Sequence, residues 1–389
     1  MNLLKTRPQL FTAVIIILFL TTLLWAESGN DAITLGETIT IKSEILDQER
    51  HMLVYLPDGY EDATTEYPVL YLLDGGSHFL HVSGVVQFLS SRGLMPQTIV
   101  VAIKNIDRNK DFLPTNVERV PTSGGAKKFL SFIADELFLY IEENYRTTPY
   151  KTLVGHSFGG TFTTYTFLEK PDTFDSYIAI SPYLHWDEEL LVNQAEKILP
   201  AEYERSKFFY MTLGDEPPYI PAIDRFVSLI EEKSPANLEF TYTQMIKETH
   251  NSIPHLTVYY GLEKLYSDWN LPQEKYDEGL AAIDEHYKNI SEKFNYDIKT
   301  PEYAINMAGY NYLLNEEIEK AIDVFQENVK RFPASANVYD SLGEAYENNK
   351  QFDLAKENFT RACELAKKDD PNFSVFKKNM ERMQKKLAE

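Results

Sequence analysis

The sequence has a single cysteine, Cys363, and it lacks the residue patterns that hold metals or phosphate groups. One cysteine cannot form a disulfide within the chain, so an internal disulfide framework is excluded. There is no HExxH motif, no cluster of His and Cys at zinc-ligand spacing, and no glycine-rich phosphate loop ending in Lys-Ser or Lys-Thr. The sequence therefore predicts that the protein uses neither a metal nor a cofactor.

Positive charge is also scarce. The chain has 38 Lys and Arg residues against 59 Asp and Glu residues, which gives a formal net charge of −21 at pH 7. A field of this sign repels nucleic acid and anionic membrane surfaces. We therefore expect no nucleic-acid partner.

The first 26 residues have the three-part layout of an export signal. Lys5 and Arg7 supply positive charge, residues 11–25 are mostly apolar, and Ala26 precedes a polar segment. The apolar run is shorter than the roughly 20 residues that a membrane-spanning helix needs. We expect a signal peptide over residues 1–26 and an exported protein, periplasmic or secreted. The alternative is an uncleaved N-terminal anchor, and only in that case do we expect the chain at a membrane. Leu24 favours this alternative, because signal cleavage after Ala26 would prefer a small residue at that position.

Residues 30–270 alternate apolar runs of strand length with helical segments, and Gly, Pro and Asp separate them. This alternation predicts an α/β domain with a mostly parallel sheet that is covered on both faces. About 240 residues can bury a substantial single core.

The most informative motif is Gly-His-Ser-Phe-Gly-Gly at residues 155–160, between an expected strand (151–154) and an expected helix (161–168). This arrangement is typical of a nucleophile elbow, in which a serine lies on a tight turn between strand and helix. The glycines on both sides suit a strained turn where strand and helix pass closely. We therefore predict the α/β-hydrolase fold, with Ser157 as the nucleophile.

A serine nucleophile needs a base and an acid that orients the base, and in α/β-hydrolases these follow in the order Ser, Asp or Glu, His. His250 follows the last expected strand (238–246), in a loop where the base belongs. His255 is the competitor, although it follows a proline and opens an expected helix. For the acid we favour Glu216, after the strand 208–213, with Asp215 as second choice.

Further segments extend this pattern, and together they resemble the esterase family of α/β-hydrolases, which includes siderophore esterases, feruloyl esterases and mycolyltransferases. The segments are residues 67–76, 108–114, 136–146, 155–160, 181–186, 214–216 and 250–262, in family order. The likeness is strongest to the enterobactin-type siderophore esterase branch, which carries an Arg-x-x-Asp-Tyr/Phe-x-Pro stretch like residues 108–114. The resemblance implies an oxyanion hole formed by the backbone N–H groups of Phe158 and Gly76, with Gly75 as the alternative to Gly76.

Two further residues are candidates for binding substrate. Arg108 either faces a polar or anionic substrate group, or forms an ion pair with Asp111 that orders the loop after the strand 99–103. Trp186 follows another expected strand, and its ring either lines the acyl or alcohol pocket or belongs to ordinary packing. The sequence leaves both alternatives open.

From residue 275 onward glycine is scarce and an internal repeat of 34 residues begins, the period of tetratricopeptide repeats. The matching pairs are Gly309 and Gly343, Tyr312 and Tyr346, Ala321 and Ala355, and Phe325 and Phe359. Because two repeats are fewer than a free-standing stack needs, we expect flanking helices at residues 274–294 and 373–387 to complete it. We therefore predict a helical tetratricopeptide-repeat domain over residues 275–389, which either binds a protein or peptide partner, or mediates self-association, or buttresses the active site.

The sequence thus favours an exported serine esterase that acts on a small-molecule ester through an acyl-enzyme on Ser157. A siderophore-like or cell-envelope ester is the expected substrate. One alternative is an acyltransferase that uses the same triad. The other is a binding protein with an inactive hydrolase domain that recruits partners through its repeats.

Overall fold

The computed structural model describes residues 34–367 and 370–389. The predicted signal peptide lies outside the described residues. Within the part of the chain that is described, no helix has both the length and the apolar character needed to cross a membrane. Residues 36–389 form one compact unit.

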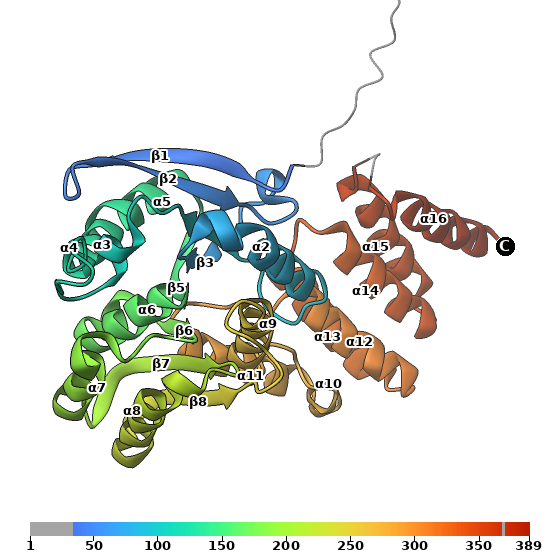
Figure 1. Cartoon of the computed structure of the whole chain (residues 1–389). Helices are drawn as coiled ribbons and strands as arrows, with labels where there is room; N and C mark the ends of the chain where they lie inside the picture. The colour runs from blue at the N-terminus through green and yellow to red at the C-terminus, as the bar shows by residue number, and fades with distance from the viewer. Residues whose placement is uncertain (1–33, 368–369) are drawn as a thin grey trace, which may run out of the picture. The chain divides into compact units, whose positions relative to one another are not determined.

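Within the described residues, eight strands form one sheet in the order β1-β2-β4-β3-β5-β6-β7-β8 (Figure 1). The strands are β1 (Glu37–Ser43), β2 (Gln48–Tyr55), β3 (Tyr67–Leu72), β4 (Ile99–Ile103), β5 (Thr147–His156), β6 (Ser176–Ile180), β7 (Glu202–Leu213) and β8 (Ala236–Gln244). Strand β2 pairs antiparallel with β1 and with β4, whereas the neighbours from β4 to β8 run parallel. The prediction of a mostly parallel sheet is therefore confirmed.

The central strands are covered on both faces. Every residue of β3, β4 and β6 is buried, and successive side chains of a strand point to opposite faces. Helix α6 packs on β5 and β6, while α9 packs on β6 and β7. The helices of this region are α2 (Gly75–Ser91), α3 (Arg108–Phe112), α4 (Ala126–Phe132), a π-helical turn (Ile133–Leu137), α5 (Phe138–Asn144), α6 (Phe158–Glu169), α7 (Trp186–Ile198), α8 (Ile220–Lys233) and α9 (Ile253–Leu265).

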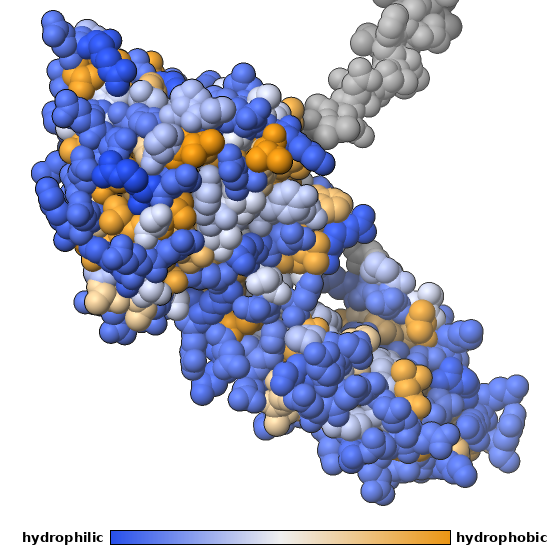
Figure 2. All heavy atoms as spheres, turned by 60° about the horizontal axis from the view of Figure 1, so that its bottom comes forward, coloured by the Kyte–Doolittle hydropathy of each residue, from blue (hydrophilic) through white to orange (hydrophobic). Residues whose placement is uncertain are grey.

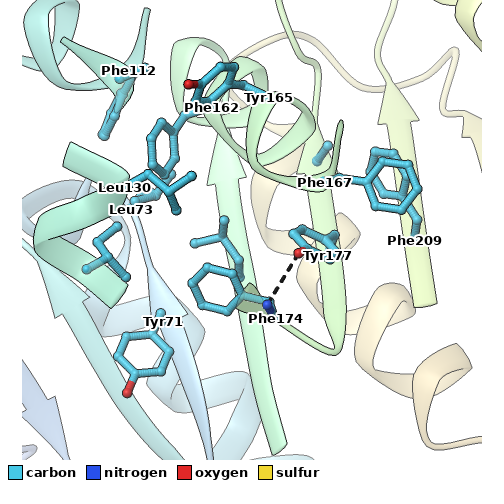
Figure 3. Close-up of a cluster of buried hydrophobic side chains, with 14 of the residues drawn as sticks. Tyr71, Leu73, Phe112, Leu130, Phe162, Tyr165, Phe167, Phe174, Tyr177 and Phe209 are labelled. Atoms are coloured by element: carbon cyan, nitrogen blue, oxygen red, sulfur yellow. Dashed lines mark hydrogen bonds between the residues drawn. The ribbon is translucent and has the colours of Figure 1, made fainter. Parts of the chain in front are cut away.

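Aromatic rings fill much of the core between the sheet and its helices (Figure 3). Phe167 of α6 lies 4.5 Å from Phe209 of β7 between ring centroids, and Phe162 lies 5.2 Å from Phe129 of α4. The hydroxyl of Tyr177 accepts a hydrogen bond from the backbone N–H of Phe174. Rings of this size bury large apolar areas, so they hold α6, and with it the turn that precedes α6, firmly against the sheet.

The chain continues as helices after residue 272: α10 (Gln273–Glu278), α11 (Leu280–Phe294), α12 (Glu302–Leu314), α13 (Ile318–Arg331), α14 (Ala336–Asn348), α15 (Phe352–Leu365) and α16 (Phe373–Ala388). The single helix predicted for residues 274–294 is wrong, because Gly279, at φ 94°, separates α10 from α11. Phe294 at the end of α11 packs against Tyr150 and Tyr266 of the sheet region, each at 5.1 Å between ring centroids.

The 34-residue period corresponds to repeated contacts between helices. A Cβ atom on Gly309 would lie 2.4 Å from the ring of Phe325, and one on Gly343 would lie 2.7 Å from the ring of Phe359. Glycine therefore lets α12 approach α13, and α14 approach α15, at equivalent positions. Figure 2 shows a face that is largely hydrophilic, with apolar residues in separate patches, as expected for a chain this acidic.

Candidate active site

Ser157 lies on the turn that joins β5 to α6. Its backbone angles are φ 60° and ψ −120°, a conformation that a residue with a side chain adopts only at a cost of about 1–3 kcal/mol. Two hydrogen bonds hold it there: the Ser157 N–H donates to the carbonyl of Ile180, and the Ser157 carbonyl accepts from the N–H of Thr161, both at 2.9 Å. The half-buried serine is thus presented at the carboxyl end of the parallel strands.

The glycines around Ser157 are required by close backbone contacts. A Cβ atom on Gly155 would lie 2.3 Å from the carbonyl oxygen of Gly159, and one on Gly160 would lie 2.9 Å from the carbonyl oxygen of Ile180. Both distances are shorter than a carbon atom can approach an oxygen without movement of the backbone. The spacing of glycines in the sequence is therefore a direct consequence of how tightly β5, α6 and β6 meet.

Glu216 follows β7, and hydrogen bonds fix its carboxylate. Oε2 accepts from the Ser181 hydroxyl at 2.6 Å and from the Gly214 N–H at 3.2 Å, while Oε1 lies 2.5 Å from Nδ1 of His250. Burial alone would raise the pKa of Glu216, but the hydrogen bonds from His250, Ser181 and Gly214 outweigh it and lower the pKa. The side chain of the neighbouring Asp215 is exposed. The structure therefore brings Glu216, and not Asp215, to His250.

His250 is oriented by the contact with Glu216. An ionised carboxylate can only accept, so the proton lies on Nδ1 of His250 and leaves Nε2 with a lone pair. The ring also contacts the rings of His156, at 4.5 Å between centroids, and Tyr219, at 5.9 Å. His255, the competing base, is exposed near the start of α9, and its ring contacts His81 instead.

Among the described residues no hydrogen bond joins the Ser157 hydroxyl to His250, and such bonds are often long in enzymes without bound substrate. Ser157 nevertheless directly follows His156, whose ring packs on His250. The turn and the base are therefore neighbours, although they are far apart in sequence.

The two predicted oxyanion donors begin neighbouring helices. Phe158 is the first residue of α6, and Gly75 and Gly76 are the first residues of α2. A Cβ on Gly75 would lie 2.7 Å from the carbonyl of Ala102, whereas the space around Gly76 is open. The N–H groups in the first turn of a helix have no partner within the helix and carry partial positive charge, so both positions suit an oxyanion.

Arg108 and Asp111 do not pair with each other, so the alternative of an ion pair between them that orders the loop is wrong. Arg108 donates from Nε and Nη2 to the two carboxylate oxygens of Asp74, at 3.0 and 3.1 Å. Asp111 instead accepts two hydrogen bonds from Arg50 of β2, in a pair that is almost fully buried. The Arg108 side chain remains 36% exposed and lies over the ring of Phe158, so it borders the site.

Trp186 is 1% exposed, so its ring is part of the core and does not face the site directly. Its indole N–H donates to the Thr115 hydroxyl at 3.0 Å, and its ring contacts Phe158 at 6.1 Å between centroids. Three residues of left-handed conformation follow, at positions 187–189, and no glycine signals this turn in the sequence. Trp186 therefore supports the site through its contact with Phe158.

Comparison with known proteins relates part of the chain to esterases. A family model described as "Putative esterase" matches residues 43–209, a segment that contains Ser157 but neither Glu216 nor His250. The ferri-bacillibactin esterase BesA of Bacillus subtilis is 33% identical over 151 residues, which are 33% of this chain and 52% of that protein. The chain thus spans about half the length of the curated relatives it matches first.

Two solved structures resemble larger parts of the chain. An IroE-like serine hydrolase from Shewanella oneidensis has a TM-score of 0.66 and 25% identity, covering 76% of this chain and 99% of that one. An uncharacterised protein from Capnocytophaga ochracea has the same TM-score at 17% identity, and covers 90% of this chain and all of that one. The second match shows only the fold, but its extent includes the helical region. Among these matches, the relatives with a stated activity are an esterase and a serine hydrolase.

Proposed function

We propose that the protein is an exported serine esterase that hydrolyses carboxylic esters through an acyl-enzyme on Ser157. The observation that carries this proposal is the 2.5 Å contact between Glu216 and His250, next to a serine on a strained turn between strand and helix. Glu216 is already held by Ser181 and Gly214, so the carboxylate is fixed before any substrate binds. A base oriented in this way is what a serine nucleophile needs.

In the proposed reaction the Ser157 oxygen attacks the ester carbonyl while Nε2 of His250 takes the hydroxyl proton. The N–H groups of Phe158 and Gly76 bind the oxyanion of the tetrahedral intermediate, and each such donor is worth about 3 kcal/mol of barrier. When the intermediate collapses, the alcohol leaves with the proton from His250. Water then repeats the sequence on the acyl-enzyme and releases the acid.

The proposed substrate is a small siderophore-like or cell-envelope ester. Support comes from relatives such as the Bacillus subtilis ferri-bacillibactin esterase, and from Arg108, which lies at the edge of the site. Arg108 is fixed by Asp74 yet partly exposed, so it can meet a polar or anionic group of a substrate. Phe158, packed on Trp186, would form an apolar part of the same wall.

The helices α12 to α15 form the proposed pair of tetratricopeptide repeats, with α11 and α16 as flanking helices. Support comes from the equivalent contacts of Gly309 with Phe325 and of Gly343 with Phe359. Stacks of this kind offer surfaces for proteins or peptides, so this region is the proposed site for a partner or for self-association.

The test is hydrolysis of a p-nitrophenyl ester series by the wild type beside Ser157→Ala and His250→Ala. We expect each substitution to lower kcat on the order of 10⁶-fold, because neither residue acts without the other. A fluorophosphonate should label the wild type and not Ser157→Ala. Turnover retained by Ser157→Ala, or a folded wild type that neither turns over nor reacts, would contradict the proposal. Product diverted to an added alcohol would instead favour an acyltransferase.

A further inference from the structure

All eight histidines of the chain lie within the described residues, and five of them form a continuous row that ends at His250. We call His255, His81, His78, His156 and His250 the histidine row. Successive ring centroids are 5.5, 5.2, 5.5 and 4.5 Å apart along it. The row links α9, α2, the end of β5 and the loop of His250, which are far apart in sequence but meet beside Ser157.

The row is not arranged as a metal site. In residues 34–367 and 370–389, no group of three or more His, Cys, Asp or Glu side chains is placed to hold a metal ion. The nitrogens of the row meet only once, where Nδ1 of His78 and Nε2 of His81 are 2.9 Å apart and share one hydrogen bond. Elsewhere the rings meet through their faces and edges, as packed aromatic rings do.

The middle of the row stays uncharged near neutral pH. Burial, together with neighbouring His250 and His78, lowers the pKa of His156 to about 4. Burial and the neighbours His78 and His255 lower the pKa of His81 to about 4 as well. Burial also lowers the pKa of His78, with Arg108 adding to the effect and Asp74 opposing it. A base that becomes a cation during the reaction therefore has neutral neighbours on this side.

Three contacts define how the imidazole of His250 lies. Glu216 holds Nδ1, Tyr219 meets the ring edge to face at 74°, and His156 lies closest, at 4.5 Å and 42° between ring planes. One hydrogen bond to Nδ1 leaves the ring free to rotate about that bond. The packing of His156 and Tyr219 removes this freedom, so that Nε2 has a fixed direction.

We propose that His156 is a positioning residue for the His250 base, and that His78 and His81 hold His156 in place behind it. The proposal rests on the proposed function, because it assigns a role within that site. The ring of His156 supplies contact area against His250, and its neutrality avoids repulsion when His250 takes the proton of Ser157. His156 itself exchanges no proton with substrate.

The experiment compares His156→Ala, His156→Phe and His156→Lys with the wild type, using p-nitrophenyl acetate from pH 5 to 9. We expect His156→Ala to lower kcat about 100-fold with KM little changed, since misplacement of a catalytic group by 1 Å costs about that much. His156→Phe should restore most of kcat, because it returns a neutral ring. His156→Lys should shift the midpoint of the acidic limb of kcat/KM to lower pH, because a like charge opposes protonation of His250.

His255→Ala is the matched control, because His255 belongs to the row but lies at its far, exposed end. We expect loss of kcat to decrease in the order His156→Ala, His78→Ala, His255→Ala, with the last equal to the wild type. A kcat of His156→Ala within threefold of the wild type, or a loss that His156→Phe does not reverse, would overturn the proposal. If Ser157→Ala keeps its activity, the proposed function fails and this role fails with it. If Ser157→Ala loses activity but the His156 variants behave like the wild type, the esterase proposal stands and the positioning role of His156 fails.

Discussion

Two carboxylates, Glu216 in the sheet region and Asp340 in the helical region, are similarly buried and yet have opposite pKa shifts. They are 9% and 7% exposed. Burial and the charge of Glu344 raise the pKa of Asp340 to about 6, against the hydrogen bonds from the amide of Asn379 and the charge of Arg382. At Glu216 the donors His250, Ser181 and Gly214 outweigh burial and lower the pKa. Burial alone therefore does not set the charge of a carboxyl group in this protein; the donors aimed at it do.

The opposite pKa shifts mean that the structure stabilises the charged form of Glu216 and destabilises the charged form of Asp340. The charge of Glu216 contributes stability above the ordinary value of 4.5, and this contribution is lost as pH falls through its lowered pKa. The charge of Asp340 costs stability wherever it is ionised. We infer that the donors around Glu216 serve the base that it orients, because packing of the fold requires no such charge.

The largest expected effect is on activity. Glu216→Gln should lower kcat for p-nitrophenyl esters about 10⁴-fold, as loss of the charge leaves His250 without its orienting partner. Asp340→Asn should leave kcat unchanged, because Asp340 lies in the helical region, where its carboxylate accepts from Asn379 of α16. Asp215→Asn is the second control, since its exposed side chain lies next to Glu216 in sequence. If kcat fell in Asp215→Asn and changed little in Glu216→Gln, the assignment of Glu216 as the orienting acid would be wrong.

A second test compares glycines from the two regions by the free energy of unfolding in urea. Gly155→Ala places a Cβ 2.3 Å from a backbone oxygen, which cannot move without distorting the Ser157 turn. Gly343→Ala places a Cβ 2.7 Å from the ring of Phe359, a buried side chain and not a backbone atom. We expect Gly155→Ala to lower the free energy of unfolding by about 3 kcal/mol or more, and Gly343→Ala to lower it by about 1 kcal/mol. The second cost is smaller because alanine also favours the helix at position 343. Equal costs would show that the two contacts are equally rigid.

These two glycines also show which features a sequence reveals. Close contacts with backbone around Ser157, and with a phenylalanine ring at Gly309 and Gly343, favour glycine, so the elbow and the 34-residue repeat could both be predicted from glycine spacing. The sequence favours Glu216 over Asp215 as the acid but leaves Asp215 as second choice, because the choice depends on Ser181, which lies 35 positions away in sequence. The pairing of Asp111 with Arg50 is equally remote, at 61 positions. The left-handed turn at 187–189 has no glycine, and so has no local signal at all.

A further expected effect is on stability of the helical region. Asp340→Asn should stabilise α14 and α16 by about 3 kcal/mol at pH 7.5, because it removes a buried charge whose pKa is raised from 3.8 to about 6. Between pH 3.8 and about 6, Asp340 binds a proton more tightly in the folded wild type than in the unfolded chain. Its stability therefore rises as pH falls from 6, and the advantage of the variant disappears below 3.8.

Hydrogen exchange of the α14 and α16 amides measures this effect locally, so the result does not depend on unfolding of the sheet region. Exchange in Asp340→Asn should slow about 150-fold relative to the wild type at pH 7.5, and the ratio should approach one under acid conditions. Amides of α6 should exchange equally in both proteins. A stabilisation that is the same at every pH would mean that the Asp340 charge is not its cause. The contrast with Glu216, whose charge is held by three donors, would then require another explanation.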